Sequence, residues 1–270
     1  MWCDNASRDC DHRNGRSVCV ISKDGLVCCL QDIDPYSGIL PDDALIAASQ
    51  ARYKLDLNTR FISQPPMSGD LWGLLPIDDA RLGIFCADVC GHGNAVAPHT
   101  RLVHTLLHLQ PQNLSRPDQV LGQLNRHLYA LFPRGRFAAM FYGVIDFAHD
   151  QLDYACSTFM PPLYRSDLTA DFSCLNGEGF PLGFLPEAKY ELRSCRFAAG
   201  AGLVIYSDAL VETPLPPHAI FTPNTLCNLA NESLSGMSAY DVNSNLIGRL
   251  NLNQNALHDD LTLITVFRKG

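Results

Sequence analysis

Aspartates stand beside apolar segments at several points along this 270-residue sequence. Two of them follow such a segment, two precede one, and a fifth follows a Pro-Pro turn; in that order they are Asp88, Asp208, Asp259, Asp260 and Asp70. Carboxylates gathered in one place repel one another unless cations neutralise them, and ligation by oxygen alone favours magnesium or manganese over zinc. The residue types therefore suggest a site for divalent cations, although aspartate is also common in turns at strand ends.

Two such ions, about 4 Å apart, can share a carboxylate, bind phosphate oxygens and lower the pKa of a water between them. The hydroxide then attacks phosphorus directly, so this chemistry needs no covalent intermediate on the protein. A nucleotide-binding kinase is a poor alternative, because the sequence has no phosphate-binding loop of the GxxxxGK[ST] type. The pattern favours hydrolysis of a phosphate ester.

The segments beside the aspartates are strand-like, and turn residues separate them. If the final strand runs antiparallel to the strands that end at Asp88 and Asp208, two strand ends and one strand start meet at the same edge of a sheet. That geometry would gather at least three carboxylates. The predicted strands are residues 59–64, 82–89, 140–146, 151–155, 163–166, 190–197, 203–207 and 261–267.

Helical periodicity marks other segments. The predicted helices are residues 42–54, 94–109, 118–132, 223–230 and 238–250. Acidic residues open the first helix, and Ser115 and Pro117 suggest a capping box with proline in the first turn of the third. Helices packed outside an antiparallel sheet core form an α+β layered architecture.

We expect two parts in the chain. Residues 1–41 form an N-terminal segment with two short apolar runs, for which a hairpin is one interpretation. Residues 42–270 form a single domain, because no internal repeat or low-complexity tract interrupts them.

Charge and composition exclude several classes of protein. Twenty basic and 28 acidic residues give a net charge of −8, so the overall field repels nucleic acid and anionic lipid. No apolar segment approaches the ~20 residues of a membrane-spanning helix, and the N-terminus lacks the basic and apolar regions of a signal peptide. We therefore expect a soluble, cytoplasmic protein that binds neither nucleic acid nor membrane.

Five motifs, in this order, resemble those of the bacterial SpoIIE/RsbU-type serine phosphatases, which are relatives of the PP2C family. The motifs are Ser68-Gly69-Asp70, Ala87-Asp88-Val89-Cys90-Gly91-His92-Gly93, Phe180-Pro181-Leu182-Gly183, Tyr206-Ser207-Asp208-Ala209-Leu210-Val211-Glu212 and Asp259-Asp260-Leu261-Thr262. The resemblance covers residues 42–269 and implies a sandwich of two antiparallel β-sheets flanked by helices, with a two-metal site at one end.

The same resemblance implies an activity and a partner. It implies a protein serine/threonine phosphatase that uses two Mn²⁺ or Mg²⁺ ions. Its substrate would be a phosphorylated regulatory protein, such as an anti-sigma-factor antagonist. The alternative is a catalytically silent PP2C-like module that binds a phosphoprotein, but the sequence keeps the aspartates that a decayed site would lose. Residues 1–41 are a remnant, a dimerisation element or a docking segment, so a homodimer is one interpretation of the sequence.

The resemblance also assigns roles to individual residues. Asp88 would bridge the two metals, and the Val89 carbonyl would ligate one of them. Asp260 would be an additional ligand or would support the others; Asp259 ranks above it because relatives with Asp-Asn at this place keep only the first acid. The remaining ligands would be Asp70, Asp208 and Asp259.

The sequence departs from the family pattern at three places. Gly73 stands where many relatives have an acid, Ala209 replaces a usual glycine, and residues 157–160 replace an Asn-Ala-Gly-His segment. The missing acid would weaken a metal contact, and the altered segment would change substrate preference more than chemistry. His92, between two glycines, is either a general acid or a residue that only packs in the turn.

Overall fold

The computed structural model describes residues 18–21, 27–30, 38–63, 68–91, 95–109, 114–212, 222–233, 236–249, 257 and 259–270. The chain divides into two compact units, residues 1–38 and 39–270. In the first unit, β1 (Val18–Ile21) pairs antiparallel with β2 (Val27–Leu30). The two short apolar runs thus form the hairpin that was one interpretation of the sequence.

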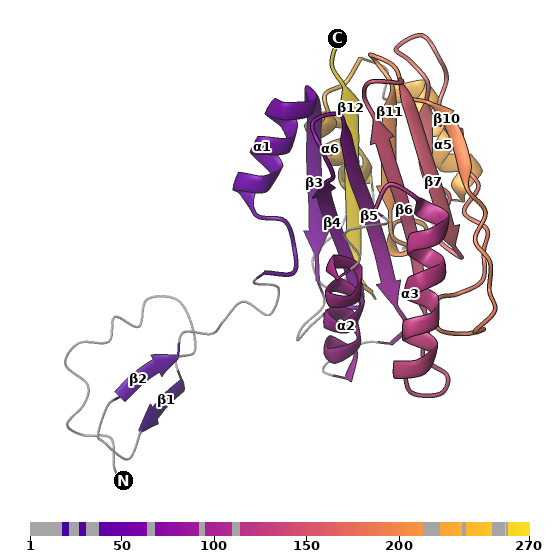
Figure 1. Cartoon of the computed structure of the whole chain (residues 1–270). Helices are drawn as coiled ribbons and strands as arrows, with labels where there is room; N and C mark the ends of the chain where they lie inside the picture. The colour runs from indigo at the N-terminus through magenta and orange to yellow at the C-terminus, as the bar shows by residue number, and fades with distance from the viewer. Residues whose placement is uncertain are drawn as a thin grey trace. The chain divides into compact units, whose positions relative to one another are not determined.

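The described part of the second unit contains two five-stranded antiparallel sheets (Figure 1). The first has the order β10 (Arg193–Arg196), β7 (Gln151–Ser157), β6 (Ala138–Asp146), β5 (Arg81–Val89) and β4 (Asp70–Pro76). The second has the order β3 (Leu55–Ile62), β12 (Leu261–Arg268), β11 (Gly202–Tyr206), β8 (Leu163–Arg165) and β9 (Ser173–Cys174). With flanking helices, this confirms the predicted α+β sandwich.

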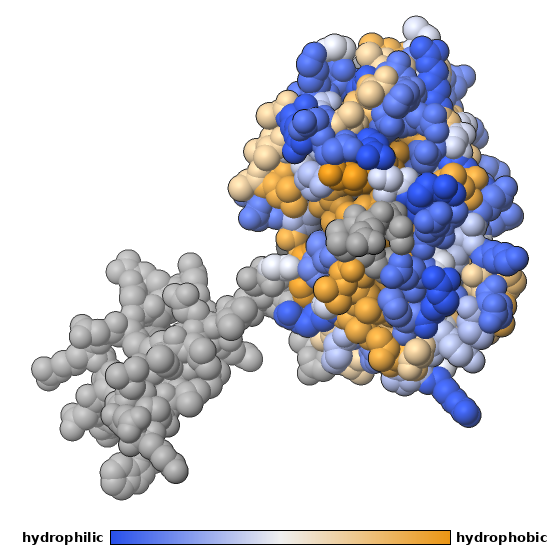
Figure 2. Space-filling view, in the orientation of Figure 1, coloured by the Kyte–Doolittle hydropathy of each residue, from blue (hydrophilic) through white to orange (hydrophobic). Residues whose placement is uncertain are grey.

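The main hydrophobic core lies between the two sheets. Alternate side chains of a strand point to the same face, and the inward-facing residues of both sheets form one buried cluster. Trp72 and Ile84 belong to it from the first sheet, and Leu203 and Ile264 belong to it from the second. Trp72 is only 3% exposed. Hydrophilic residues predominate on the surface seen in Figure 2, with apolar side chains exposed in patches among them.

Helices cover the outer faces of the sandwich (Figure 1). Those that pack on the first sheet are α2 (Ala97–His108) and α3 (Pro117–Leu131). Those that pack on the second sheet are α4 (Ala209–Glu212), α5 (Pro223–Ser233) and α6 (Ala239–Arg249), and α1 (Asp43–Tyr53) contacts β3 and β4. Asp42 caps α1, because its Oδ1 accepts a hydrogen bond of 2.7 Å from the backbone N–H of Leu45.

One local prediction was wrong, and one long strand was missed. The capping box expected before α3 does not form: its N-cap residue is Arg116, whose side chain makes an ion pair with Asp118 and no cap hydrogen bond. The strand β4 was not predicted, because six of its seven residues are buried and no alternation of exposed and buried positions reveals a strand. Its outer face lies under α2 and its inner face in the core.

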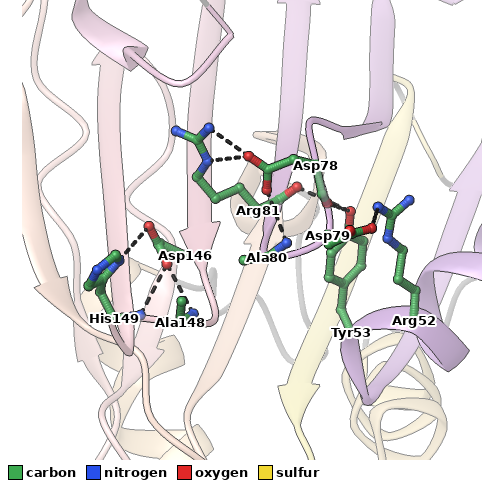
Figure 3. A network of polar contacts seen from close by, with 9 residues as sticks. All are labelled: Arg52, Tyr53, Asp78, Asp79, Ala80, Arg81, Asp146, Ala148 and His149. Atoms are coloured by element: carbon green, nitrogen blue, oxygen red, sulfur yellow. Dashed lines mark hydrogen bonds and ion pairs between the residues drawn. The ribbon is translucent and has the colours of Figure 1, made fainter.

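The turns at one end of the first sheet are held by polar contacts (Figure 3). Asp78 accepts two hydrogen bonds, of 2.8 and 2.6 Å, from the Arg81 guanidinium, and the Tyr53 hydroxyl donates to the Asp78 carbonyl at 2.7 Å. Asp146 likewise accepts from the backbone N–H groups of the β6–β7 turn. Exposed ion pairs stabilise little, so these contacts chiefly fix the β4–β5 and β6–β7 hairpins. The open end of the β4–β5 hairpin carries Asp70.

A buried asparagine attaches α6 to the second sheet. Asn243, which is fully buried, donates from Nδ2 to the backbone carbonyl of Asn58 at 3.0 Å. Its Oδ1 accepts a hydrogen bond of 2.6 Å from the Thr265 hydroxyl on β12. Both partners are strand residues, so this one side chain joins α6 to β3 and β12.

We predict that Asn243→Leu destabilises the protein by about 1–3 kcal/mol, because it leaves the buried Thr265 hydroxyl without its acceptor. The exposed Asn224→Leu on α5 is the control and should change stability by less than about 0.5 kcal/mol. Chemical denaturation of both variants measures the difference; equal stabilities would show that the buried network contributes nothing.

Candidate metal centre

Two of the predicted ligands face each other across neighbouring strands of the first sheet. Asp70 begins β4 and is the direct cross-strand partner of Asp88 near the end of β5. Both share the alternation of Trp72 and Cys86, so they lie on the inner face of the sheet. Like charges directly opposite each other are destabilising, so this pairing is not explained by stability.

The other acidic residues come from the second sheet. Asp208 follows β11, and Asp259 and Asp260 precede β12, which pairs antiparallel with β11. The expected antiparallel relation of these two strands is therefore correct. The expectation that all strand ends meet at one edge of a single sheet is wrong, because β5 belongs to the other sheet. The aspartates meet instead where the two sheets approach each other at one end of the sandwich.

Hydrogen bonds join the two sheets at this end. The Thr262 hydroxyl on β12 donates to Asp70 Oδ2 at 2.6 Å. The backbone N–H of Gly69 donates to Asp260 Oδ2 at 2.9 Å. Each bond connects the start of β4 with the start of β12, so the first sheet's Asp70 is held beside the second sheet's acids.

Burial and mutual repulsion raise the pKa values of these carboxyl groups. Burial first, and then the negative charges of Asp208 and Asp259, raise the pKa of Asp88 to about 7. Burial, followed by the charge of Glu212, raises the pKa of Asp208 to about 6. Burial and the charge of Asp88 raise the pKa of Asp70 well above its usual range. Part of each shift comes from neighbouring acidic charges, so the carboxylates lie close enough to repel one another.

Asp259 and Asp260 have different surroundings. Asp260 is 4% exposed, and its carboxylate is engaged with Gly69. Asp259 is exposed, and its Oδ1 accepts a hydrogen bond from the backbone N–H of Asp260 at 2.8 Å. Asp259 is therefore the one of the pair that is free to turn toward a ligand, while Asp260 positions the β4 segment.

The backbone carbonyl of Val89 lies close to Gly69, beside the Asp88 carboxylate. A Cβ atom added to Gly69 would stand 2.6 Å from the Val89 oxygen and 3.2 Å from Asp88 Oδ1. Glycine is thus required at this position, because any side chain would collide with the backbone oxygen that is proposed as a ligand. The Ser68-Gly69-Asp70 motif has a steric reason as well as a chemical one.

The types of donor atom at this site suit hard divalent cations. Its oxygen atoms belong to carboxylates and one carbonyl, which Mg²⁺ and Mn²⁺ prefer. Within the residues that the structure describes, no three acidic, histidine or cysteine side chains converge as ligands of one ion. Side-chain rotations would have to bring the oxygens together when a cation binds.

Two charged residues near the cluster were not predicted from the sequence to belong to the site. Glu212 ends α4 one turn after Asp208, and its charge raises the pKa of Asp208. Arg136 donates from Nη1 to the Cys90 carbonyl at 2.7 Å, and its guanidinium packs on Gly91, where an added Cβ would stand 2.0 Å from Nη1. Glu212 was visible at the end of a motif, whereas nothing in the sequence placed Arg136 beside Cys90.

The structure accounts for one departure from the family pattern. A Cβ atom on Gly73 would stand 2.4 Å from the Phe85 ring on the outer face of the first sheet. An acid at this position would therefore point away from Asp70 and Asp88 and collide with a buried ring. Ala209 is buried at the start of α4, and in residues 157–160 the Ser157 hydroxyl donates to the Phe180 carbonyl at 2.9 Å.

The histidines have no place in the cluster of described residues. His92 lies outside the described residues. His104 and His108 lie next to each other on α2, with their rings tilted by 37° and the ring centroids 4.0 Å apart. Burial lowers the pKa of His104 to about 4. These two pack against each other on the helix.

Comparison with known proteins identifies the family. The sequence profile of the family described as Stage II sporulation protein E (SpoIIE) matches residues 78–269. The chain belongs to the SpoIIE family. Phosphoserine phosphatase RsbU of Bacillus subtilis is 27% identical over 215 residues, which cover 80% of this chain and 64% of RsbU. Phosphoserine phosphatase RsbP of the same organism is 27% identical over 163 residues, which cover 59% of this chain and 40% of RsbP. The chain spans less than two thirds of either relative.

Solved structures share the fold of this SpoIIE-family chain. The SiaA-PP2C domain of Pseudomonas aeruginosa matches with a TM-score of 0.73 at 16% identity, covering 87% of this chain and 92% of that one. RsbX, solved in complex with magnesium, matches with a TM-score of 0.59 at 15% identity, covering 78% and 94%. The sandwich is therefore of the PP2C type. No helix among the described residues has the length and apolar character needed to cross a membrane.

We predict that Asp88→Asn stabilises the metal-free SpoIIE-family domain, and that the gain grows with pH. The folded pKa of Asp88 is raised from 3.8 to about 7, so the carboxyl group is neutral in both states only well below its unfolded pKa. Between pH 4 and pH 7 only the unfolded state releases the proton, and wild-type stability falls. Asparagine removes this loss, so the variant should gain up to a few kcal/mol by pH 8, since each pKa unit corresponds to about 1.4 kcal/mol.

Thermal unfolding in EDTA at pH 4.5 and pH 8 measures this gain. The exposed Asp171→Asn is the control and should unfold like the wild type at both values. A gain at Asp88 that is independent of pH would contradict the electrostatic interpretation.

Proposed function

We propose that this chain is a protein serine/threonine phosphatase that uses two divalent cations to hydrolyse phosphoserine or phosphothreonine. The observation that carries the proposal is the meeting of aspartates from four separate segments at one end of a PP2C-type sandwich. Membership in the SpoIIE family and the two phosphoserine phosphatases among the relatives support the activity.

Each acidic residue has a role in this proposal. Asp88 would bridge both ions, since it is the carboxylate that the charges of Asp208, Asp259 and Asp260 all affect. The Val89 carbonyl and Asp70 add ligands from the first sheet. Asp208 and Asp259 add ligands from the second sheet. Two bound Mg²⁺ or Mn²⁺ ions would neutralise the carboxylates and acidify a shared water that attacks phosphorus.

Residues around the ligands orient them and the substrate. Thr262 holds Asp70 in place through its hydroxyl, and Asp260 holds Gly69 through its carboxylate. Arg136 supplies a positive charge beside Cys90, where its remaining N–H donors can contact a substrate phosphate. These side chains act by positioning and electrostatics, without forming a bond to phosphorus.

Two exposed aromatic residues offer a docking surface next to Arg136. Phe137 and Phe184 are 37% and 61% exposed, and their rings meet edge to face with centroids 6.5 Å apart. An apolar surface of this kind suits a protein partner better than a small anion. We infer that the substrate is a folded phosphorylated regulatory protein, such as an anti-sigma-factor antagonist, in keeping with the sequence resemblance.

The alternative is a catalytically silent module that binds a phosphoprotein. The observation in its favour is that no three described ligands converge on one point. Retention of all the predicted aspartates favours the enzyme. The two are distinguished by turnover, because a binding module releases no phosphate from a partner that it binds.

We predict that EDTA abolishes release of phosphate from a phosphopeptide and that Mn²⁺ or Mg²⁺ restores it. Asp88→Asn should lower turnover by orders of magnitude while the protein stays folded, because it removes the carboxylate shared by both ions. The exposed Asp171→Asn should retain wild-type turnover. Full activity in chelator, with no bound ion found by elemental analysis, would overturn the two-metal site.

We also predict that a folded phosphoprotein substrate has a much higher kcat/KM than its isolated phosphopeptide, because only the folded partner reaches the surface beside the site. With a net charge of −8 the protein field attracts neither substrate. Phe184→Ser should lower kcat/KM for the folded substrate and leave that for the peptide unchanged. The equally exposed Leu168→Ser is the control. Equal kcat/KM values for the two substrates of the wild type would show that docking contributes nothing.

A further inference from the structure

A cavity lies at the end of the second sheet that is opposite to its acidic residues. Arg165 ends β8 and pairs with Gly202 at the start of β11, which in turn pairs with Phe267 near the end of β12. Asp208 follows the other end of β11, and Asp259 precedes the other end of β12. The cavity lies at the Arg165 end of these strands and is thus distinct from the candidate metal centre. Its volume is about 380 Å³. Its lining includes Asp56, Arg165, Gly200, Met237, Phe267 and Lys269.

Arg165 is the unusual residue of this cavity. It is 3% exposed, and its Nε has no hydrogen-bond partner. Its guanidinium carbon lies 4.7 Å from the ring centroid of Phe267 and 5.1 Å from that of Phe172. A Cβ atom on Gly202 would stand 2.6 Å from the Phe267 ring and 3.2 Å from Arg165 Nε, so glycine is needed for this close approach. The guanidinium is thus held in place by aromatic rings.

The nearby acidic side chains accept hydrogen bonds from backbone N–H groups and make no ion pair with Arg165. Asp56 Oδ2 accepts a hydrogen bond of 2.8 Å from the backbone N–H of Ala239, at the start of α6. Asp167 Oδ1 accepts from the backbone N–H groups of Thr169 and Ala170, at 2.9 and 3.1 Å. Within the described residues, Arg165 makes no ion pair with a carboxylate.

The other basic residues of the lining differ from Arg165. Arg268 donates to the carbonyls of Phe197 and Phe147, at 2.6 and 3.0 Å, and makes an ion pair with Asp150 at 2.7 Å. Lys269 is exposed. Burial lowers the pKa of Arg165, and the charge of Asp167 offsets only part of this effect. The cavity therefore offers one buried cation that makes no ion pair within the described residues and one exposed ammonium group.

A buried charge without an anionic partner is strongly unfavourable, and contact with aromatic faces offsets only part of that cost. An oxyanion that accepts two parallel hydrogen bonds from a guanidinium removes the remainder. We propose that this cavity binds the carboxylate or phosphate group of a small anionic ligand through Arg165, with Lys269 at its mouth. The ligand differs from the phosphatase substrate, because the two sites lie at opposite ends of β11 and β12.

Titration of the full chain in EDTA tests the proposal, because the candidate metal centre then holds only repelling carboxylates and the result is independent of phosphatase activity. Inorganic phosphate and citrate are the two probes, with sodium chloride at matched ionic strength as the reference. At least one probe should raise the Tm saturably, as ligand binding to the folded state requires. A rise in Tm with phosphate alone would assign a phosphate group to the ligand, and a rise with citrate alone would assign a carboxylate. A rise with both would show that the cavity accepts either oxyanion.

Arg165→Met is the decisive variant. It should bind the effective probe at least tenfold more weakly and have a higher Tm than the wild type without ligand, because an apolar chain replaces an unpaired buried charge. Arg126→Met, at an exposed arginine on α3, is the matched control and should retain wild-type binding. A chain extended by two alanines beyond Gly270 should also bind like the wild type, which excludes a role of the terminal carboxylate.

The proposal is overturned if neither probe stabilises the wild type beyond chloride. It is also overturned if Arg165→Met loses stability and responds to the probes like the wild type, since Arg165 would then only support Phe172 and Phe267. If Arg165→Met does not fold, Met237→Trp provides the second test. This variant fills the cavity without removing the charge and should lower the affinity for the effective probe at least tenfold.

Discussion

Carboxylates crowd together at one end of the sandwich, and the rest of the fold must overcome their mutual repulsion. Asp70 and Asp88 are direct partners on adjacent strands, and burial raises the pKa of both. The Thr262 hydroxyl stabilises the Asp70 carboxylate, but in the absence of a cation the effects of burial and of the Asp88 charge are larger. The strands must therefore be held in place by interactions elsewhere along their length.

The core between the sheets provides that support. Each strand that ends at an acidic residue continues into the buried apolar cluster, through Ile84 on β5, Ile205 on β11 and Ile264 on β12. Burial of apolar surface contributes about 25 cal/mol per Å² and extends over the whole interface. The unfavourable charges occupy only the strand ends. Folding can thus tolerate a site whose own residues oppose it, as functional sites commonly require.

Polar groups at the strand ends have two different functions. The Asp78 and Asp146 turns satisfy backbone N–H groups and fix hairpins. Thr262 and Asp260, at the other end, connect the two sheets and orient the first-sheet acids. Charge is also distributed along the second sheet, with acids beside one end of β11 and β12 and the buried Arg165 beside the other. The same strands thus separate two sites of opposite charge.

The amino-acid sequence was sufficient to predict a cation site and most of the elements that position its residues. Aspartates beside apolar segments predicted a cation site, and helical periodicity predicted α1, α2 and α3 to within a few residues. Five ordered motifs identified the family and the sandwich. These signals are local, because a strand or helix shows its buried face in the spacing of its own residues.

Which segments lie side by side is visible in the folded chain and not in its sequence. The tertiary structure assigned β5 and β11 to different sheets, and it revealed β4, whose two buried faces leave no alternation in the sequence. It also engaged Asp260 with Gly69 and left Asp259 exposed, a distinction that two adjacent aspartates cannot express. Arg165 reads in the sequence as an ordinary polar residue at a strand end. Its burial depends on Phe267, about 100 residues away along the chain, because packing between distant segments sets the environment of a side chain.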